Sequence, residues 1–197
     1  MKKMASVVSL QPRGRAKEDF TSYLGMVITL GAWSVMFAGL FFVYAGVRLA
    51  APSWPPPGVP RLSALVPGLA TVVLLSSSVT AQAALTAIRD ARRDRMRALL
   101  GVTVVLGALF LGIQYTVWSA VHDGGLTMES GTYGSVFYAL TYFHAVHVVA
   151  GIGALVWLLV RAGAYTAHQH ATVRHCTMFW HFVDVVWLVT FVTVFLL

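Results

Sequence analysis

Charged residues are scarce in this chain of 197 residues, where Asp, Glu, Lys and Arg together make up 11%. A soluble globular domain carries charge on about a quarter of its residues. Hydrophobic residues reach 58% and the mean hydropathy is +0.75, so an ordinary soluble domain is excluded. Cysteine is nearly absent as well. The single Cys176 excludes a disulfide framework and the multi-cysteine patterns of zinc or iron-sulfur sites.

Acidic residues are the rarer of the two charged classes, with 7 Asp and Glu against 14 Lys and Arg, which gives a formal net charge of +7. A basic protein can bind nucleic acid, but its basic residues must then line a continuous face. Here they fall in blocks between apolar runs. That arrangement is typical of loops beside a membrane and argues against a nucleic-acid partner.

Five long apolar stretches, free of charge except for one acidic residue in the last, divide the chain. A helix needs about 20 residues to cross a bilayer, and transmembrane strands would show alternation, whereas these runs are apolar on all sides. We therefore predict an all-α, polytopic membrane protein. A tail of residues 1–19 precedes one domain, residues 20–197, which is a bundle of five transmembrane helices. The expected spans are about 22–47, 62–88, 98–121, 134–160 and 175–197.

The basic residues predict the orientation of the bundle, because cytoplasmic loops are enriched in Lys and Arg. The tail, the second loop and the fourth loop hold 12 of the 14. These are Lys2, Lys3, Arg13, Arg15, Lys17, Arg89, Arg92, Arg93, Arg95, Arg97, Arg161 and Arg174. The third loop has no basic residue and carries Asp123 and Glu129. We expect a cytoplasmic N-terminus and a C-terminus outside. The arginines of the second loop also suit anionic lipid head groups, but the topology signal alone accounts for them.

Two polar pairs interrupt the last two spans. His144 and His147 lie three residues apart in the fourth span, and His181 and Asp184 have the same spacing in the fifth. Residues three apart share one side of a helix. Three His and one Asp could bind iron, copper or zinc, or two His could ligate haem.

The competing interpretation is a structural hydrogen-bond network between packed helices. The chain lacks the Glu-x-x-His pairs that build di-iron bundles, and aromatic residues crowd around both polar pairs. We therefore expect no catalytic or metal site, and a structural network of His144, His147, His181 and Asp184. A carboxyl group facing lipid would be costly, so Asp184 should lie in a helix interface and accept a hydrogen bond from one of these histidines.

A proline-rich segment follows the first span. "PSWPPPGVP", residues 52–60, cannot continue a helix because proline lacks an N–H donor and restricts the residue before it. We expect a stiff outer turn, with Trp54 at the membrane interface. Trp54, Arg174, Trp180 and Trp187 are our candidates for contacts with lipid or a neighbouring subunit.

Four ordered motifs carry a resemblance to a known family. "FHAVHVVAG", and about thirty residues later "FWHFVDVVW", resemble the paired signature of subunit III of the haem-copper oxidases, the cytochrome c and quinol oxidases. "SWPPPGVP" and "LLSSSVT" are similar to further segments of that family, and "YGSVFYALTYFHAVH" extends the match. The resemblance runs from about Leu24 to Leu197. The five spans resemble the short bacterial members, which lack the first two helices of the longer form.

The resemblance implies a non-catalytic subunit of a bacterial terminal oxidase, which reduces oxygen to water and pumps protons in the aerobic respiratory chain. Such a subunit binds no haem or copper itself, these cofactors being held by partner subunits. It stabilises subunit I, its main partner, contacts subunit II and a small subunit IV, and holds phospholipid in the bacterial cytoplasmic membrane. There it is thought to support oxygen access and proton uptake, and to protect the catalytic centre from inactivation during turnover.

The chain departs from the family pattern at two positions. Ser34 and Val117 stand where acidic residues are usual, which leaves Asp184 as the one acidic residue in any expected span. Functions of the family that depend on these two carboxylates are therefore not expected to carry over to this chain.

Two alternatives to the oxidase subunit remain. One is an accessory subunit of nitric oxide reductase, whose last helices are similar. The other is an autonomous haem-binding electron carrier or ion transporter that uses the central His and Asp residues.

Overall fold

The computed structural model describes residues 13–54, 63–167 and 169–197, with side chains from Asp19 onwards. Its long helices are α1 (Arg13–Ala50), α2 (Leu65–Arg89), α3 (Arg93–Asp123), α4 (Thr132–Val160) and α5 (Ala171–Phe191). A short 3-10 helix, η1 (Ala162–Ala164), follows α4, and a π-helical turn, η2 (Val192–Leu196), continues α5. Within these residues, five helices are long and apolar enough to cross a membrane. The predicted all-α architecture with five spanning helices is confirmed.

Most helix ends lie a few residues outside the expected spans, whereas α2 begins at Leu65, three residues after the expected start of its span. The largest difference is in α1, which already begins at Arg13, so residues 13–19 of the expected tail are helical. Charged residues at the ends of a spanning helix can still be helical, because the helix satisfies its own backbone groups on either side of the bilayer surface. Most of the proline-rich turn, from Pro55 onwards, lies outside the described residues.

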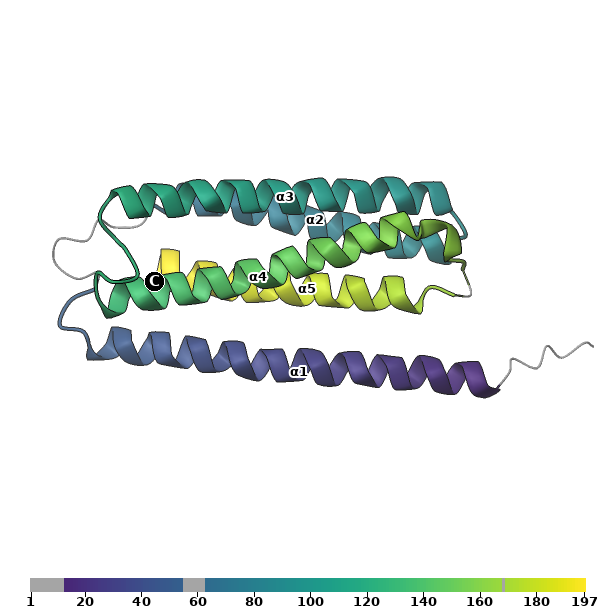
Figure 1. Cartoon of the computed structure of the whole chain (residues 1–197), viewed down its shortest axis with the longest axis horizontal. Helices are drawn as coiled ribbons and strands as arrows, with labels where there is room; N and C mark the ends of the chain where they lie inside the picture. Colours follow the sequence, from purple (N-terminus) through teal and green to yellow (C-terminus); the bar gives the residue numbers. More distant parts are fainter. Residues whose placement is uncertain (1–12, 55–62, 168) are drawn as a thin grey trace, which may run out of the picture.

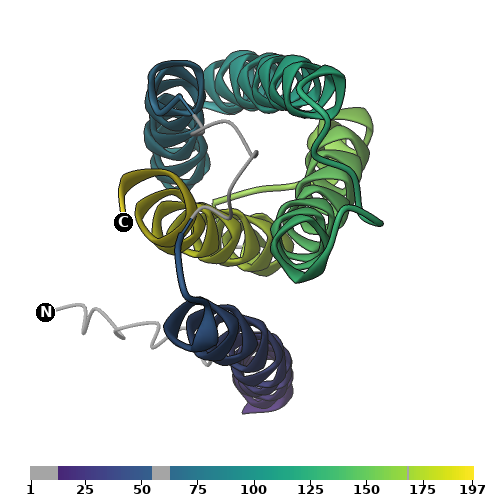
Figure 2. The same cartoon turned by 90° about the vertical axis from the view of Figure 1, so that its left-hand side faces the viewer.

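Helices α2, α3, α4 and α5 stand at the corners of a square, whereas α1 lies outside it, alongside α4 and α5 (Figure 2). All five helices run along the long axis of the molecule (Figure 1). In the most apolar stretch of α1, 6% of the residues are buried within the chain, compared with 44% in α2 and 50% in α5. The four-helix square therefore contains the core, and α1 packs against one of its sides.

The interior of the square is filled by large side chains, of which Trp180 and Trp187 of α5 are the bulkiest fully buried ones. Two glycines make room for the Trp180 indole. A Cβ added at Gly107 of α3 would lie 2.8 Å from Trp180 Cη2, and one added at Gly151 of α4 would lie 2.8 Å from Cε3. Because neither glycine has a side chain, both helices can approach the six-membered ring of the Trp180 indole closely.

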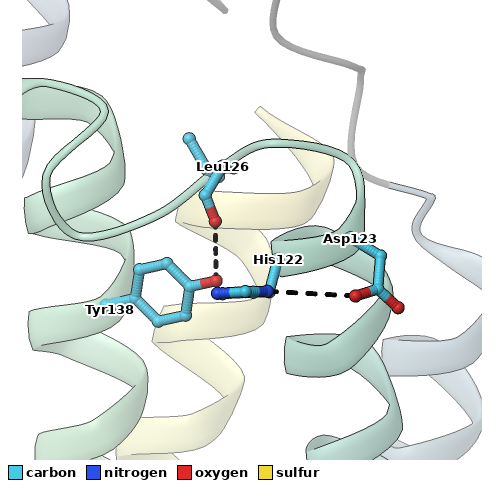
Figure 3. A network of polar contacts seen from close by, with 4 residues as sticks. All are labelled: His122, Asp123, Leu126 and Tyr138. Atoms are coloured by element: carbon cyan, nitrogen blue, oxygen red, sulfur yellow. Dashed lines mark hydrogen bonds and ion pairs between the residues drawn. The ribbon is translucent and has the colours of Figure 1, made fainter.

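The connections between the square's helices are tight. The α2–α3 turn contains Ala91 in a left-handed conformation, with φ of 59°. In the α3–α4 loop, the Tyr138 hydroxyl of α4 donates to the Leu126 carbonyl oxygen at 2.8 Å (Figure 3). The neighbouring His122–Asp123 ion pair spans 3.8 Å between largely exposed side chains, so it adds little stability. The buried tyrosine bond and the hydrogen bond from the Ser135 hydroxyl to the Met128 carbonyl oxygen at 2.7 Å hold this loop to α4.

Candidate functional site

Helix α5 is joined to α2 by indole N–H groups. Trp180 Nε1 donates to Ser77 Oγ at 3.0 Å, and Trp187 Nε1 donates to Thr71 Oγ1 at 2.9 Å. Each hydroxyl in turn donates to its own helix, Ser77 to the Leu74 carbonyl at 2.6 Å and Thr71 to the Pro67 carbonyl at 2.8 Å. Each hydroxyl thus accepts one hydrogen bond from an indole and donates one to a carbonyl oxygen. Two buried tryptophans are fixed in place between the helices.

His181, the residue after Trp180, also contacts α2. Its Nδ1 lies 2.8 Å from Ser78 Oγ, and its Nε2 lies 3.2 Å from Gln82 Oε1. Because an amide oxygen can only accept, Nε2 carries the proton, and Nδ1 of the neutral ring accepts from the Ser78 hydroxyl. Both ring nitrogens of His181 are therefore satisfied by α2.

Asp184 lies inside the protein, as its cost in lipid requires. The residue is 4% exposed, and its carboxyl group lies beside the Ser78 hydroxyl of α2. The hydrogen bond that we expected from a histidine is absent from the described residues, because His181 turns its ring towards Ser78 and Gln82 instead. The expectation of interface burial agrees with the structure, whereas the expected pairing does not.

The two histidines of α4 face different neighbours. His144 is 1% exposed, with its ring 5.9 Å from that of Phe110 on α3 and 5.2 Å from that of Trp187 on α5. His147 is half-buried towards α1, where its ring lies 5.2 Å from Trp33 and 5.1 Å from Phe37. Three residues turn a helix by about 300°, so the pair diverges enough to serve two interfaces.

The expected four-residue network is therefore divided into separate parts. His181 bonds to α2, and Nδ1 of His147 lies 2.8 Å from the Phe143 carbonyl oxygen of its own helix. His144 makes no hydrogen bond to any described residue, and Asp184 lies beside the Ser78 hydroxyl of α2. The sequence-based assignment missed the partners on α2, which are Thr71, Ser77, Ser78 and Gln82. The sequence signal for Ser77, Ser78 and Gln82 is the polar segment "LLSSSVTAQ", residues 74–82.

The four candidates for outer contacts also separate into two groups. Trp180 and Trp187 are 0% and 1% exposed, so their assignment to lipid or a neighbouring subunit is wrong. Their indole N–H groups find acceptors inside the bundle, which makes the interior the better environment.

Trp54 and Arg174 lie nearer the surface, at opposite ends of α1. The Trp54 ring is 4.6 Å from that of Tyr133, and the Arg48 guanidinium lies 5.9 Å from its centroid. The Arg174 guanidinium lies 5.2 Å from the Tyr23 ring. Both guanidinium contacts have cation–π geometry. The Arg174–Tyr23 contact attaches one end of α1 to α5. At the other end, the Trp54–Tyr133 ring contact and the hydrogen bonds from Arg48 to the Thr193 and Leu197 carbonyl oxygens make the attachment.

The two positions that depart from the family pattern have local explanations. Ser34 of α1 donates to the Leu30 carbonyl oxygen at 2.8 Å on an exposed side of the helix. Val117 of α3 is 8% exposed and lines an apolar cavity of about 310 Å³ between α2 and α3. Neither position has charged groups that would require a carboxylate.

Metal binding would need several ligands close together. Within residues 13–54, 63–167 and 169–197, no three residues from His, Cys, Asp and Glu gather into a group that could hold a metal ion. The geometry of the site thus supports packing and hydrogen bonding between helices.

Comparison with known proteins gives a consistent result. The family model described as cytochrome c oxidase subunit III matches residues 18–197. A protein of Synechocystis sp. named cytochrome c oxidase subunit 3 is 38% identical over 176 residues, which cover 88% of this chain and 74% of the relative. Proteins of the same name from Thermostichus vulcanus and Bacillus subtilis are 33% and 31% identical. The first covers 88% of this chain and 86% of the relative, and the second 98% and 94%.

Proposed function

Because the chain belongs to the cytochrome c oxidase subunit III family, we propose that it is the non-catalytic subunit of a bacterial terminal oxidase that stabilises subunit I and holds phospholipid. Subunit III of a haem-copper oxidase is the function that the family supports, and neither nitric oxide reductase nor an autonomous haem carrier or ion transporter is favoured. The family lacks metal centres of its own. Haem and copper would be held by the partner subunits.

The observation that carries this proposal is that the central polar side chains of α5 form hydrogen bonds to a neighbouring helix. Three side chains of α5, those of Trp187, Trp180 and His181, are hydrogen-bonded to α2. These bonds join helices in surroundings where water does not compete for them. A rigid four-helix square suits a subunit that supports a neighbour.

The partners follow from the same proposal. Subunit I would be the main contact, with subunit II and a small subunit IV beside it. Phospholipid would fill the apolar surface that remains, such as the outward side of α1, where Ile28, Val35 and Phe42 are 64%, 74% and 81% exposed. Side chains of this kind are favourable only against lipid or another apolar surface.

We further propose that the complex lies in the bacterial cytoplasmic membrane, with the N-terminus and the α2–α3 turn on the cytoplasmic side. Multi-pass insertion follows from the five spanning helices and the family. The support for the orientation is the arginine content of the α2–α3 turn and the helix ends beside it, with Arg89 at the end of α2, Arg92 in the turn, and Arg93, Arg95 and Arg97 at the start of α3.

Deleting this subunit from the native oxidase tests the proposal. The purified complex should keep its haem spectrum and its initial rate of oxygen consumption, but should lose activity faster during sustained turnover. Re-expression of the chain should restore the sustained rate. Loss of haem or copper from the complex in stoichiometric amounts, or their presence on the isolated subunit, would show that the chain has a catalytic role.

A further inference from the structure

A chain of four polar side chains leads from the inside of the bundle to its surface at the α2–α5 contact. Asp184 of α5 is 4% exposed, and its carboxyl group lies beside the hydroxyl of Ser78 on α2. Ser78 Oγ lies 2.8 Å from Nδ1 of the half-buried His181. His181 Nε2 in turn lies 3.2 Å from Oε1 of Gln82, an exposed residue of α2. One hydroxyl and one imidazole thus connect the buried carboxyl group to the outside of the bundle.

The surroundings of Asp184 offer no fixed charge that could pair with it. The apolar middle stretches of all five helices contain no Asp, Glu, Lys or Arg other than Asp184. The histidines of α4 contact aromatic rings, His144 those of α3 and α5, and His147 those of α1. A buried carboxylate without a partner charge is costly, and such a group is neutralised by a proton instead. Among the described residues, His181 is the base that the contacts of Ser78 connect to Asp184.

The possible proton positions follow from what each atom can donate or accept. Gln82 Oε1 can only accept, so His181 Nε2 keeps its proton in every arrangement. When the imidazole is neutral, the Ser78 hydroxyl donates to Nδ1, and its oxygen can accept from a protonated Asp184. When Asp184 is ionised, the Ser78 hydroxyl donates to the carboxylate, and its oxygen accepts from a protonated Nδ1. Ser78 and both nitrogens of His181 are satisfied in either arrangement.

We propose that Asp184, Ser78 and His181 form a proton relay, which holds one proton between the buried carboxyl group and the half-buried imidazole. In the transfer, the O–H bond of the Asp184 acid breaks and a new O–H bond forms at Ser78 Oγ. At the same time the original O–H bond of Ser78 breaks and an N–H bond forms at His181 Nδ1. No electron is transferred, and the three side chains together have no net charge before or after the step.

The neutral arrangement is the resting one, because it separates no charge in apolar surroundings. The half-buried His181 is the end of the relay at which the proton can exchange with groups outside the bundle. This inference goes beyond the proposed support of subunit I and does not depend on it, since the relay consists of side chains of α2 and α5 alone.

Infrared spectroscopy of the purified complex tests the relay, because a protonated carboxylic acid has a carbonyl-stretching band that a carboxylate lacks. The spectrum of the wild type minus that of Asp184→Asn should contain this band, and the band should shift in D₂O because the relay leads to the surface. Ser78→Ala removes the hydroxyl beside the acid, so the band should move to a higher frequency and respond to D₂O more slowly. Ser76→Ala is the control, because the exposed Ser76 hydroxyl is bonded to the Val72 carbonyl oxygen at 2.8 Å, and it should change neither property.

Two results would overturn the proposal. One is a difference spectrum without the carboxylic-acid band, which would show that Asp184 is ionised at rest. The other is a band whose frequency and response to D₂O are the same in Ser78→Ala as in the wild type, which would show that the serine does not connect the acid to His181. If Asp184→Asn does not assemble, the comparison of the wild type with Ser78→Ala decides, because the frequency changes only for an acid bonded to Ser78.

Discussion

The fit of Trp180 between two glycines makes Gly151→Ala the most informative substitution. A Cβ at this position would lie 2.8 Å from Trp180 Cε3 and 2.9 Å from Cζ3. The ring has little freedom to move away, because its Nε1 is bonded to Ser77 and its six-membered ring also lies close to Gly107. The methyl group must therefore displace either α4 or the indole, and displacement of the indole breaks the bond to α2.

The change in stability that Gly151→Ala causes is the sum of two opposing effects. Overpacking of a well-packed core costs about 1–3 kcal/mol, whereas Gly to Ala in a helix interior gains about 1 kcal/mol in propensity. Gly153→Ala supplies the second term alone, since nothing lies within 4 Å of a Cβ added there. The two variants share the same helix, so the difference between them should be the strain, with Gly151→Ala less stable by about 1–3 kcal/mol.

The assay is thermal unfolding of the purified complex in one detergent, followed by the amount of this subunit that remains bound after heating. Gly151→Ala should release the subunit at a lower temperature than Gly153→Ala. Combining Gly151→Ala with Trp180→Phe should give less than the sum of the single effects, because the smaller ring relieves the contact. Equal stability of the two alanine variants would show that the interior can absorb a methyl group and that the close approach has no energetic weight.

Three further predictions concern the α2–α5 contact, the α2–α3 turn and the topology. Ser77→Ala should destabilise the square by about 1–3 kcal/mol, because it leaves the buried Trp180 N–H without an acceptor. The control is Ser76→Ala, which removes an exposed hydroxyl bonded to the Val72 carbonyl of its own helix and should have little effect in the same unfolding assay. Ala91→Gly should raise the unfolding temperature, since a left-handed residue other than glycine costs about 1–2 kcal/mol, and an unchanged or lower temperature would contradict the strain. In a Cys176→Ala background, an impermeant thiol reagent should label Asp123→Cys but not Arg92→Cys in intact cells, and the reverse pattern would invert the proposed orientation.

The number and length of the helices could be predicted from the sequence because lipid imposes a simple condition on it. Charge must be excluded for about 20 residues, and each helix must satisfy its own backbone. The burial of Asp184 could be predicted on the same grounds, since its cost in lipid is independent of the neighbouring helix. These inferences need only the polarity of each segment.

The hydrogen-bond partners could not be predicted, because they depend on how each helix is rotated about its axis. The spacing of His181 and Asp184 suggested that the two act together on α4, but rotation of α5 turns His181 towards α2. The hydroxyls of α2 could bond to their own carbonyls, and they do so, but they also accept from α5. A segment's own sequence shows what its side chains can bond to, and the packing of its neighbours decides which bond forms.

The difference between α1 and the square has a physical basis in the membrane. Burial of apolar surface between two helices brings no hydrophobic gain when the alternative is contact with lipid, so packing and hydrogen bonds must hold helices together. The square has both, through the bonds of Trp180, Trp187 and His181 to α2. Helix α1 meets the square through ring contacts of Trp33 and Phe37, through the Arg174–Tyr23 cation–π contact, and through Arg48, whose guanidinium donates to the Thr193 and Leu197 carbonyl oxygens. Few residues of α1 are buried within the chain, so α1 gains most from an apolar neighbour on its free side.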